Sequence, residues 1–294
     1  MAAVTTKPLV VIVGETASGK SALALEIARR YRGEIISADS WAVYKGFDIG
    51  TAKPSLQEQA EIPHHLIDVA DPAVGYSAAV FKVAAEQAIT EITSRGMLPV
   101  LAGGTGLYVD SVLYNYSFLP KSAPEQRELL NKMDIEQLVQ LAGKKQLALE
   151  SIDTRNKRRL IRLIENDGAL PARHALRPDT LVLGMRMPKE SLNARITRRV
   201  DAMLSQGLER EVYVLAGRYG WDAEPMKGVG YREFQAFFEN RQTLEETRAQ
   251  IILNTQKLAK KQRTWFQRNK SIHWLDDPRN AVDLVTTFLD KYHI

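Results

Sequence analysis

Residues 14–21 read Gly-Glu-Thr-Ala-Ser-Gly-Lys-Ser and match the phosphate-binding pattern G-x-x-x-x-G-K-S. An apolar run from Leu9 to Val13 precedes this loop, and apolar residues recur at helical spacing from Ala22 to Ala28. A strand, a glycine-rich loop and a helix in this order can bind an anion, because backbone N–H groups surround it at the helix N-terminus. The residues expected to hold a phosphate ester are Gly14, Glu15, Thr16, Ala17, Ser18, Gly19, Lys20 and Ser21.

Three side chains of this loop have predicted roles. Lys20 supplies a mobile cation, the Ser21 hydroxyl is offered to Mg²⁺, and the Thr16 hydroxyl would add a donor to the anion site. The loop does not identify the ester that it holds. Most chains with such a loop hydrolyse or transfer the terminal phosphate of a nucleotide, so ATP or another nucleotide is the first hypothesis.

The chain up to about residue 120 predicts an α/β core of the P-loop NTPase type with a mostly parallel sheet, because strand-like and helix-like segments alternate. Ligands of such sheets lie beyond the carboxyl ends of the strands. The phosphate-binding loop, Asp39-Ser40 and Gly103 to Gly106 should therefore meet at one edge. The expected strands are Leu9 to Val13, Glu34 to Ser37 and Leu98 to Leu101, and the expected helices start at Ser21 and span Ser77 to Thr93.

Two further segments complete the predicted organisation. Residues 121–178 are charge-rich and helix-forming, which indicates an inserted all-helical subdomain. Residues 179–294 would return to the core through a strand and continue as a helical C-terminal region. The elements expected in these two segments are helices in Pro124 to Met133, Ile135 to Leu141, Ser191 to Leu204, Glu209 to Ala216 and Leu244 to Phe266, and a strand within Thr180 to Met187.

The amino-acid composition limits the reactive groups and metal sites that the chain can form. The chain has no cysteine, which excludes disulfides, thiolate metal sites and a cysteine nucleophile, so a bound metal should have oxygen ligands, as Mg²⁺ does. No apolar run approaches the roughly 20 residues that span a bilayer. We expect a cytoplasmic enzyme, a monomer without an obligate protein partner.

Positive charge is concentrated in two blocks. The chain carries a net charge of +5, but residues 121–200 carry +7 and residues 227–270 carry +6. Residues 1–120 carry −3. Such blocks on an otherwise mildly acidic chain are typical of a surface that binds a polyanion, although a solvated helical face is the alternative.

Asp39 follows the expected strand Glu34 to Ser37 and lies beside the phosphate-binding loop. A carboxylate in this position can hold Mg²⁺ or accept a proton from the nucleophile that attacks the phosphate ester's substrate. A role as a turn or capping residue is the structural alternative.

Seven segments, taken in order, resemble the bacterial tRNA dimethylallyltransferases, also called tRNA isopentenyltransferases. Asp48 to Pro54, which reads Asp-Ile-Gly-Thr-Ala-Lys-Pro, is the most specific of them. The resemblance extends over nearly the whole chain. The other segments are Gly14 to Ser21, Ser37 to Ser40 with Val43 to Lys45, Pro63 to Asp68 with Asp71-Pro72, Gly103 to Tyr108, Val229 to Arg232 and Leu258 to Trp265.

The resemblance implies transfer of a dimethylallyl group from its diphosphate to the exocyclic amine of the adenosine 3′ of the anticodon. The phosphate-binding loop would then hold a diphosphate leaving group, and nucleotide hydrolysis would be the wrong inference. By the resemblance, Thr16, Lys20 and Arg199 stabilise the leaving group and Asp39 is the general base. The adenine would leave its stack to reach this site.

The resemblance also assigns tRNA contacts, by which the basic blocks would bind the anticodon stem-loop. Phosphate contacts would give a salt-dependent affinity, and base contacts in the unpaired loop would supply the choice of sequence. The residues implied are Asp39, Ser40, Trp41, Ala42, Thr105, Arg127, Arg158, Arg159, Leu160, Ile161, Arg162, Lys227, Gly228, Val229, Gly230, Tyr231, Arg232, Lys260, Lys261, Arg263 and Trp265.

The chain departs from the family pattern at Glu15, at 153–157 and at Lys227. Glu15 replaces the usual proline and adds a negative charge to the anion loop unless its side chain faces away. Three other functions stay open on the residues alone: a nucleotide kinase, a prenyltransferase acting on free adenine nucleotides, and a non-enzymatic RNA-binding protein. The basic blocks favour tRNA over the first two, and Asp39 and Thr16 favour an enzyme over the third.

Overall fold

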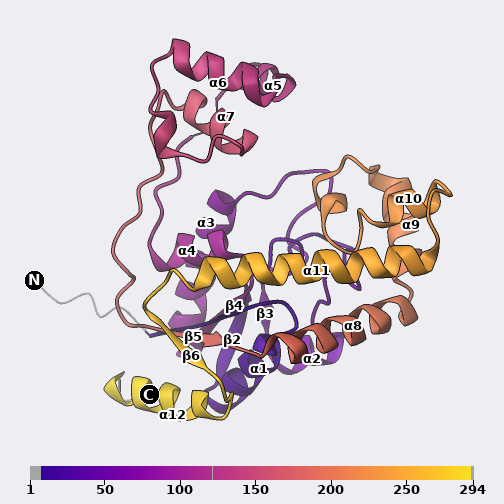
Figure 1. The fold of residues 1–294 in the computed structure, drawn as a ribbon. Coiled ribbons are helices and arrows are strands. Elements are labelled where there is room, and N and C mark those ends of the chain that lie inside the picture. Colours follow the sequence, from indigo (N-terminus) through magenta and orange to yellow (C-terminus); the bar gives the residue numbers. More distant parts are fainter. Residues whose placement is uncertain (1–7, 121, 293–294) are drawn as a thin grey trace, which may run out of the picture. The chain divides into compact units, whose positions relative to one another are not determined.

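A six-stranded sheet forms the centre of the larger part of the molecule (Figure 1). The computed structural model describes residues 8–120 and 122–292. The strand order is β3-β2-β4-β1-β5-β6, and every neighbouring pair is parallel. The α/β class with a mostly parallel sheet is therefore confirmed. The strands are β1 (Leu9–Gly14), β2 (Gly33–Ser37), β3 (His64–His65), β4 (Leu98–Gly103), β5 (Thr180–Met185) and β6 (Ile272–Leu275).

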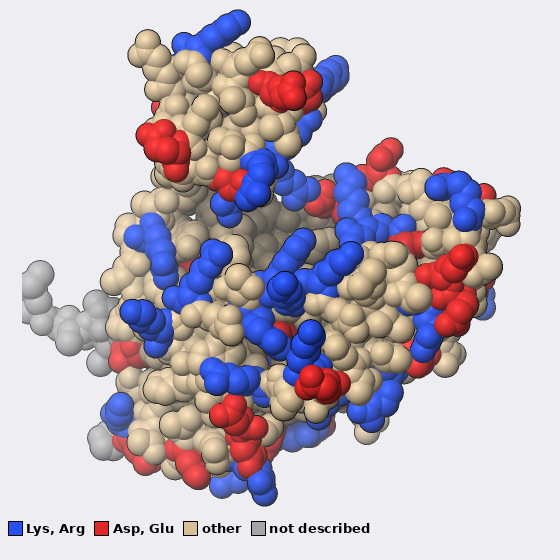
Figure 2. All heavy atoms as spheres, in the orientation of Figure 1, with Lys and Arg blue, Asp and Glu red and all other residues tan. Residues whose placement is uncertain are grey.

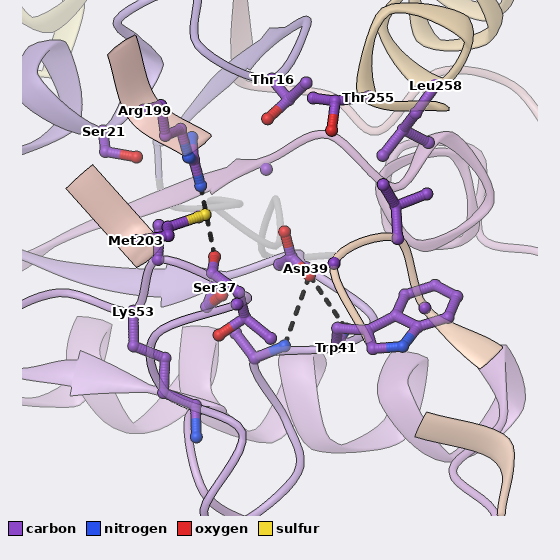
Figure 3. Close-up of a pocket in the computed structure, with 18 of the residues that line it drawn as sticks. Thr16, Ser21, Ser37, Asp39, Trp41, Lys53, Arg199, Met203, Thr255 and Leu258 are labelled. Atoms are coloured by element: carbon purple, nitrogen blue, oxygen red, sulfur yellow. Dashed lines mark hydrogen bonds between the residues drawn. The ribbon is translucent and has the colours of Figure 1, made fainter. Parts of the chain in front are cut away.

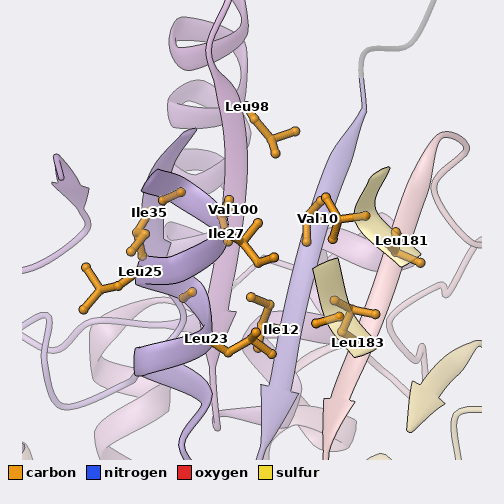
Figure 4. Close-up of a cluster of buried hydrophobic side chains, with 14 of the residues drawn as sticks. Val10, Ile12, Leu23, Leu25, Ile27, Ile35, Leu98, Val100, Leu181 and Leu183 are labelled. Carbon is orange, nitrogen blue, oxygen red and sulfur yellow. The ribbon is translucent and has the colours of Figure 1, made fainter. Parts of the chain in front are cut away.

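The strands at the centre of this sheet are continuous apolar runs because helices cover both faces of a parallel sheet. All residues of β1 are buried. On one face, Val10 and Ile12 of β1 pack with Leu23 and Ile27 of α1 (Lys20–Arg30), and α12 (Asn280–Leu289) joins the same cluster (Figure 4). Burial of this cluster fixes the position of the loop between β1 and α1.

The remaining helices of this part surround the sheet and extend beyond it. In Figure 1, α11 and α8 run side by side across the strand ends, and they are in contact along their length. Helix α11 begins at a capping box of Thr243 and Glu246, and its bounds equal those predicted from the sequence. The helices are α2 (Leu56–Glu61), α3 (Ala78–Ser94), α4 (Gly106–Leu113), α8 (Lys189–Ser205), α9 (Leu208–Tyr219), α10 (Phe234–Phe238) and α11 (Leu244–Phe266), with 3-10 turns at Glu224–Lys227 and Asp290–Tyr292.

A second compact unit comprises Tyr114–Leu176. Its helices are α5 (Pro124–Lys132), α6 (Ile135–Lys144) and α7 (Lys157–Glu165), with a 3-10 turn at Leu149–Ser151. The core of this unit contains Leu130, Leu138, Ala142, Leu160, Ile161 and Ile164.

The bounds of this unit differ from the predicted 121–178. The outgoing and returning chain segments pair at its base, where Ser117 N–H donates to the Ala172 carbonyl at 3.0 Å. The helical pattern that guided the prediction starts only beyond this pairing. The predicted boundary therefore lies several residues late at the N-terminal side.

The prediction that the chain after Leu204 contains only helices is wrong. Residues Ile272–Leu275 form β6, which pairs with β5 at the edge of the sheet. Four residues are too few for their spacing to distinguish a strand from a helical turn. Within the described residues, no helix is both long enough and apolar enough to cross a membrane.

Candidate active site

The phosphate-binding loop connects β1 to α1 as predicted. Gly19, the residue before α1, has a φ of +99°, which favours glycine because a side chain is strained there. No side chain caps the N-terminus of α1, and no acidic residue lies in its first turn. The N-terminal end of this helix is thus suited to an anionic ligand.

Two cations lie close together beside this loop. Burial and the nearby charge of Arg199 together lower the pKa of Lys20 to about 8. Burial likewise lowers the pKa of Arg199, which comes from α8 and donates from Nη2 to the Thr51 carbonyl at 3.3 Å. The Lys20 ammonium donates to the Glu15 carbonyl at 3.3 Å. Two partly desolvated cations side by side, of which one lowers the pKa of the other, indicate a site for an anion.

Asp39 lies two residues beyond β2 and points into the cavity that these cations line (Figure 3). Its Oδ1 accepts hydrogen bonds from the backbone N–H groups of Trp41 at 2.9 Å and Ala42 at 3.3 Å. The carboxylate is therefore held in one orientation by its own turn. Its negative charge partly offsets those of Lys20 and Arg199, since it favours the protonated form of both.

The third predicted segment meets Asp39 and its neighbours at the same edge. Ser40 N–H donates to Thr105 Oγ1 at 3.1 Å, and that hydroxyl donates to Ser40 Oγ at 3.1 Å. A Cβ on Gly103 would lie 2.2 Å from the Ala38 carbonyl oxygen, so only glycine fits there. The expected convergence of the three loops is confirmed.

These groups surround a cavity of about 670 Å³. Thr16, Ser21 and Arg199 lie around one part of it, and Asp39 and Trp41 lie toward another (Figure 3). Apolar side chains of α8 and α11 line part of the wall, namely Ile196, Val200, Met203, Ile251 and Leu258.

Gln262 of α11 connects two of the three loops, and the sequence prediction missed it. Its Oε1 accepts the Thr16 N–H at 2.7 Å, and its Nε2 donates to the Gly104 carbonyl at 3.1 Å. The prediction treated the surrounding basic segment as an RNA contact only. No local pattern shows that α11 crosses the phosphate-binding loop, because the two are far apart in the sequence.

Glu15 faces away from the anion site. Its carboxylate is buried and accepts two hydrogen bonds from Arg263 of α11, from Nε at 2.6 Å and from Nη2 at 3.1 Å. The pair explains how a negative charge is tolerated in this loop. Arg263 thus has a structural role at this loop that the sequence did not predict, and its assignment as an RNA contact stays a prediction.

Two aromatic residues of the predicted RNA surface have structural contacts. The Trp265 indole donates to Asp110 Oδ2 at 3.0 Å and packs against Gly106, where a Cβ would lie 2.4 Å from the ring. Tyr231 is fully buried, and its hydroxyl donates to Glu211 Oε1 at 2.8 Å. The assignment of Tyr231 as a direct RNA contact is corrected, because its side chain is fully buried, whereas Trp265 is only half-buried and its assignment stays a prediction.

The segment 227–232 lines the cavity that Asp39 faces. Trp41 Nε1 donates to the Pro225 carbonyl at 2.8 Å, and its ring lies where a Cβ of Gly228 would be. Gly230 has a φ of +96°, which again favours glycine. Lys227 and Arg232 are exposed at the rim.

In the second unit, the structure corrects two of the predicted RNA contacts, because Leu160 and Ile161 are fully buried in its core. Arg127 and Arg162 both bind the buried carboxylate of Glu165, at 2.6 and 2.9 Å, and their assignment as RNA contacts stays a prediction. Within the described part of this unit, two of the predicted contacts keep exposed side chains, Arg158 and Arg159.

Basic side chains gather on the face of the larger unit along which α11 runs (Figure 2). Lys257, Lys260 and Lys261 of this helix line the rim of the cavity. No group of three or more His, Cys, Asp or Glu side chains that could hold a metal occurs among the described residues.

Comparisons with known proteins agree with this geometry. The model of the family described as IPP transferase matches residues 42–269. A tRNA dimethylallyltransferase of Staphylococcus epidermidis is 38% identical over 97% of this chain and 93% of the relative, and one of Roseiflexus sp. is 41% identical over 94% and 95%.

Solved structures give the same result. The tRNA delta(2)-isopentenylpyrophosphate transferase of S. epidermidis superposes with a TM-score of 0.74 at 34% identity, covering 98% of this chain and 100% of that one. A eukaryotic dimethylallyltransferase, in a structure described as acting on tRNA, gives a TM-score of 0.85 at 26% identity, covering 97% and 80%.

Proposed function

The chain belongs to the IPP transferase family and has the activity of a tRNA dimethylallyltransferase; we propose that it moves a dimethylallyl group from dimethylallyl diphosphate to N6 of the adenosine 3′ of the anticodon. Diphosphate is the second product. The observation that carries this proposal is the pair Lys20 and Arg199, two partly buried cations that line one cavity with Asp39 beside a helix N-terminus that no side chain caps.

The anion site stabilises the leaving group. As the bond between the allylic carbon and its oxygen breaks, negative charge grows on the diphosphate and positive charge on the carbon. Lys20, Arg199, the Thr16 hydroxyl and the N–H groups of the loop interact more strongly with the growing negative charge than with the ground state. The low solvent access that lowers the pKa of both cations strengthens this interaction.

The Ser21 hydroxyl lies at this site and fits one Mg²⁺ ligand, with the remaining ligands supplied by diphosphate oxygens and water. Such an ion would neutralise part of the charge on the diphosphate.

Asp39 is the general base. An exocyclic amine of adenine is a weak nucleophile, and its nitrogen loses a proton as the new carbon–nitrogen bond forms. The Trp41 and Ala42 N–H groups fix the carboxylate so that it faces the cavity. A base in this position accepts that proton directly.

The anticodon stem-loop is the proposed RNA ligand. The exposed lysines of α11, together with Lys227, Arg232, Arg158 and Arg159, would contact phosphates, and the target base would enter the cavity past Trp41, Thr105 and the glycines 228 and 230. As an enzyme of tRNA, it would act in the cytoplasm.

The direct test uses purified protein, Mg²⁺, dimethylallyl diphosphate and an anticodon stem-loop RNA, followed by mass spectrometry of the RNA. We expect one added five-carbon unit on the adenosine 3′ of the anticodon. Prenylation of free AMP with no change in the RNA would instead identify a nucleotide prenyltransferase. Rapid ATP turnover with RNA of unchanged mass would identify a kinase or an ATPase.

A further inference from the structure

Within the part of the chain that the structure describes, Arg199 donates to one protein acceptor, the carbonyl of Thr51. Thr51 belongs to the loop Asp48 to Pro54, which connects the end of the β2 region to α2. The direction in which Arg199 points into the cavity therefore depends on the conformation of this loop.

The carboxylate of Glu211, on α9, accepts hydrogen bonds from three backbone N–H groups of this loop. Glu211 Oε2 accepts from the backbone of Asp48 at 3.2 Å and of Ile49 at 2.8 Å, and its Oε1 accepts from Gly50 N–H at 3.1 Å. Oε1 also accepts from the buried Tyr231 hydroxyl at 2.8 Å. Three successive N–H groups on one anion are a strong local constraint, because hydrogen bonds to a charged acceptor are stronger than neutral ones.

Hydrogen bonds of Lys53 hold the other side of the 48–54 loop. Lys53 is almost completely buried and donates to the Tyr44 carbonyl at 2.7 Å and to the carboxylates of Asp48 at 2.7 Å and Asp68 at 2.5 Å. A Cβ on Gly50 would lie 2.5 Å from the Tyr231 ring, so the loop lies directly on that ring. The carbonyl of Thr51 is therefore presented to Arg199 from a loop that is held on both sides.

We propose that Glu211 is a positioning residue for the anion site: it holds the 48–51 loop so that the Thr51 carbonyl orients Arg199 toward the diphosphate. The inference rests on the proposed function only in taking Arg199 as a diphosphate ligand. Glu211 does not line the cavity and contacts no reacting group. Its effect passes through two hydrogen-bonding steps, from Glu211 to the loop and from the loop to Arg199.

Glu211→Gln is the informative substitution. An amide keeps the shape of the side chain but replaces one acceptor oxygen by an NH₂ group, which must face at least one N–H group of the loop or the Tyr231 hydroxyl. The expected result is about tenfold weaker binding of inorganic diphosphate, as for the loss of a charged hydrogen-bond acceptor.

A double-mutant cycle separates positioning from a general effect on stability. The affinity for inorganic diphosphate with Mg²⁺ is measured by calorimetry in the wild type, Glu211→Gln, Arg199→Ala and the double variant. If Glu211 acts through Arg199, the tenfold loss falls to less than about twofold when Arg199 is already alanine. An equal loss in both backgrounds, or no loss in either, overturns the proposal.

Two further variants complete the experiment. Glu209→Gln makes the same charge change on an exposed side chain of α9 and should leave diphosphate binding unchanged. Tyr231→Phe removes only the neutral partner of Glu211 and should weaken binding about two- to threefold, again only while Arg199 is present. A loss that persists in Tyr231→Phe with Arg199→Ala counts against the proposal, even if Glu211→Gln fails to fold.

Prenyl transfer by the wild type is measured separately. Absence of transfer would refute the proposed reaction, whereas the diphosphate cycle would still decide whether Glu211 orients Arg199. The two conclusions can therefore fail independently.

Discussion

At the scale of single residues, the site depends on charges that are only partly compensated within the protein. Burial lowers the pKa of Lys20 to about 8, and Asp39 opposes this effect without cancelling it. The charge of Arg199 also lowers the pKa of Lys20, and a bound diphosphate would offset this repulsion. In the free protein, the charges of Lys20 and Arg199 therefore favour binding of an anion at the position where the leaving group is expected.

Asp39→Asn should lower the rate of prenyl transfer at least about a hundredfold, because the amide cannot accept the proton. The amide oxygen can still accept from the Trp41 and Ala42 N–H groups, so the turn should persist. Single-turnover kinetics measure the loss, and filter binding should show nearly unchanged affinity for RNA. Transfer at a near-normal rate would remove Asp39 from the role of base.

The pair Glu15 and Arg263 gives a second prediction. Arg263→Gln leaves a buried carboxylate without its cation and should lower the free energy of unfolding by about 3 kcal/mol. Adding Glu15→Gln should restore part of this loss, because the two amides are both neutral. Urea denaturation measures both effects.

Arg268→Gln is the control for that pair, since it changes an exposed arginine two residues beyond the end of α11. It should leave stability unchanged. Additive effects of the two substitutions at Glu15 and Arg263 would show that the pair contributes nothing as a unit.

At the scale of elements, helices α7 and α11 each carry residues with contacts inside the protein as well as exposed basic residues. In α11, Gln262 and Arg263 hold the phosphate-binding loop while Lys257, Lys260 and Lys261 line the cavity rim. In α7, Arg162 binds Glu165 while Arg158 and Arg159 are exposed. These roles differ even between residues one helical turn apart, such as Arg158 and Arg162, so spacing along the helix does not separate them.

The second unit should lose stability in acid through Glu165. Burial by itself raises the pKa of this carboxyl, but hydrogen bonds from Arg127, Ser122 and Arg162 outweigh burial and hold it below its ordinary value of 4.5. A carboxyl whose pKa is lowered by folding adds stability above its unfolded pKa, and this stability is lost as the pH falls through the folded pKa.

Glu165→Gln tests this prediction. The variant should be less stable than the wild type at pH 7, and the difference should shrink as the pH falls below about 4.5, where the wild type also loses the charge. Hydrogen exchange of amides in α5 to α7 at several pH values measures the difference. A gap that stays constant from pH 7 to pH 3 would contradict the assignment.

At the scale of the whole molecule, the proposed chemical groups lie in one compact unit, whereas the proposed RNA contacts occur in both. The larger unit holds the complete set of predicted chemical groups, and the unit Tyr114–Leu176 contributes exposed arginines. RNA affinity should therefore be separable from diphosphate affinity.

Arg158→Ala with Arg159→Ala should weaken binding of an anticodon stem-loop and reduce the slope of log affinity against log salt by roughly 1 to 2. Binding of diphosphate should not change. Lys132→Ala in α5 is the control, as it removes an exposed cation that pairs with Glu128. An unaltered salt slope in the double variant would exclude these arginines as phosphate contacts.

Local sequence determined the parts of this protein that depend on near neighbours. The phosphate-binding loop, the apolar strands around it, the position of Asp39 after β2 and the helix Leu244–Phe266 all follow from spacing and apolar periodicity. The convergence of three loops also follows, because parallel strands end at one edge of their sheet.

Only the tertiary structure determined which charged side chains form ion pairs or hydrogen bonds within the protein. Glu15 meets Arg263 and Glu211 meets the 48–50 loop across long sequence separations, and no local pattern records such partners. The same holds for Gln262, Tyr231 and Trp265, whose side chains look like surface ligands until their neighbours are known. Charge and spacing are properties of a segment, whereas burial and pairing are properties of the packed chain.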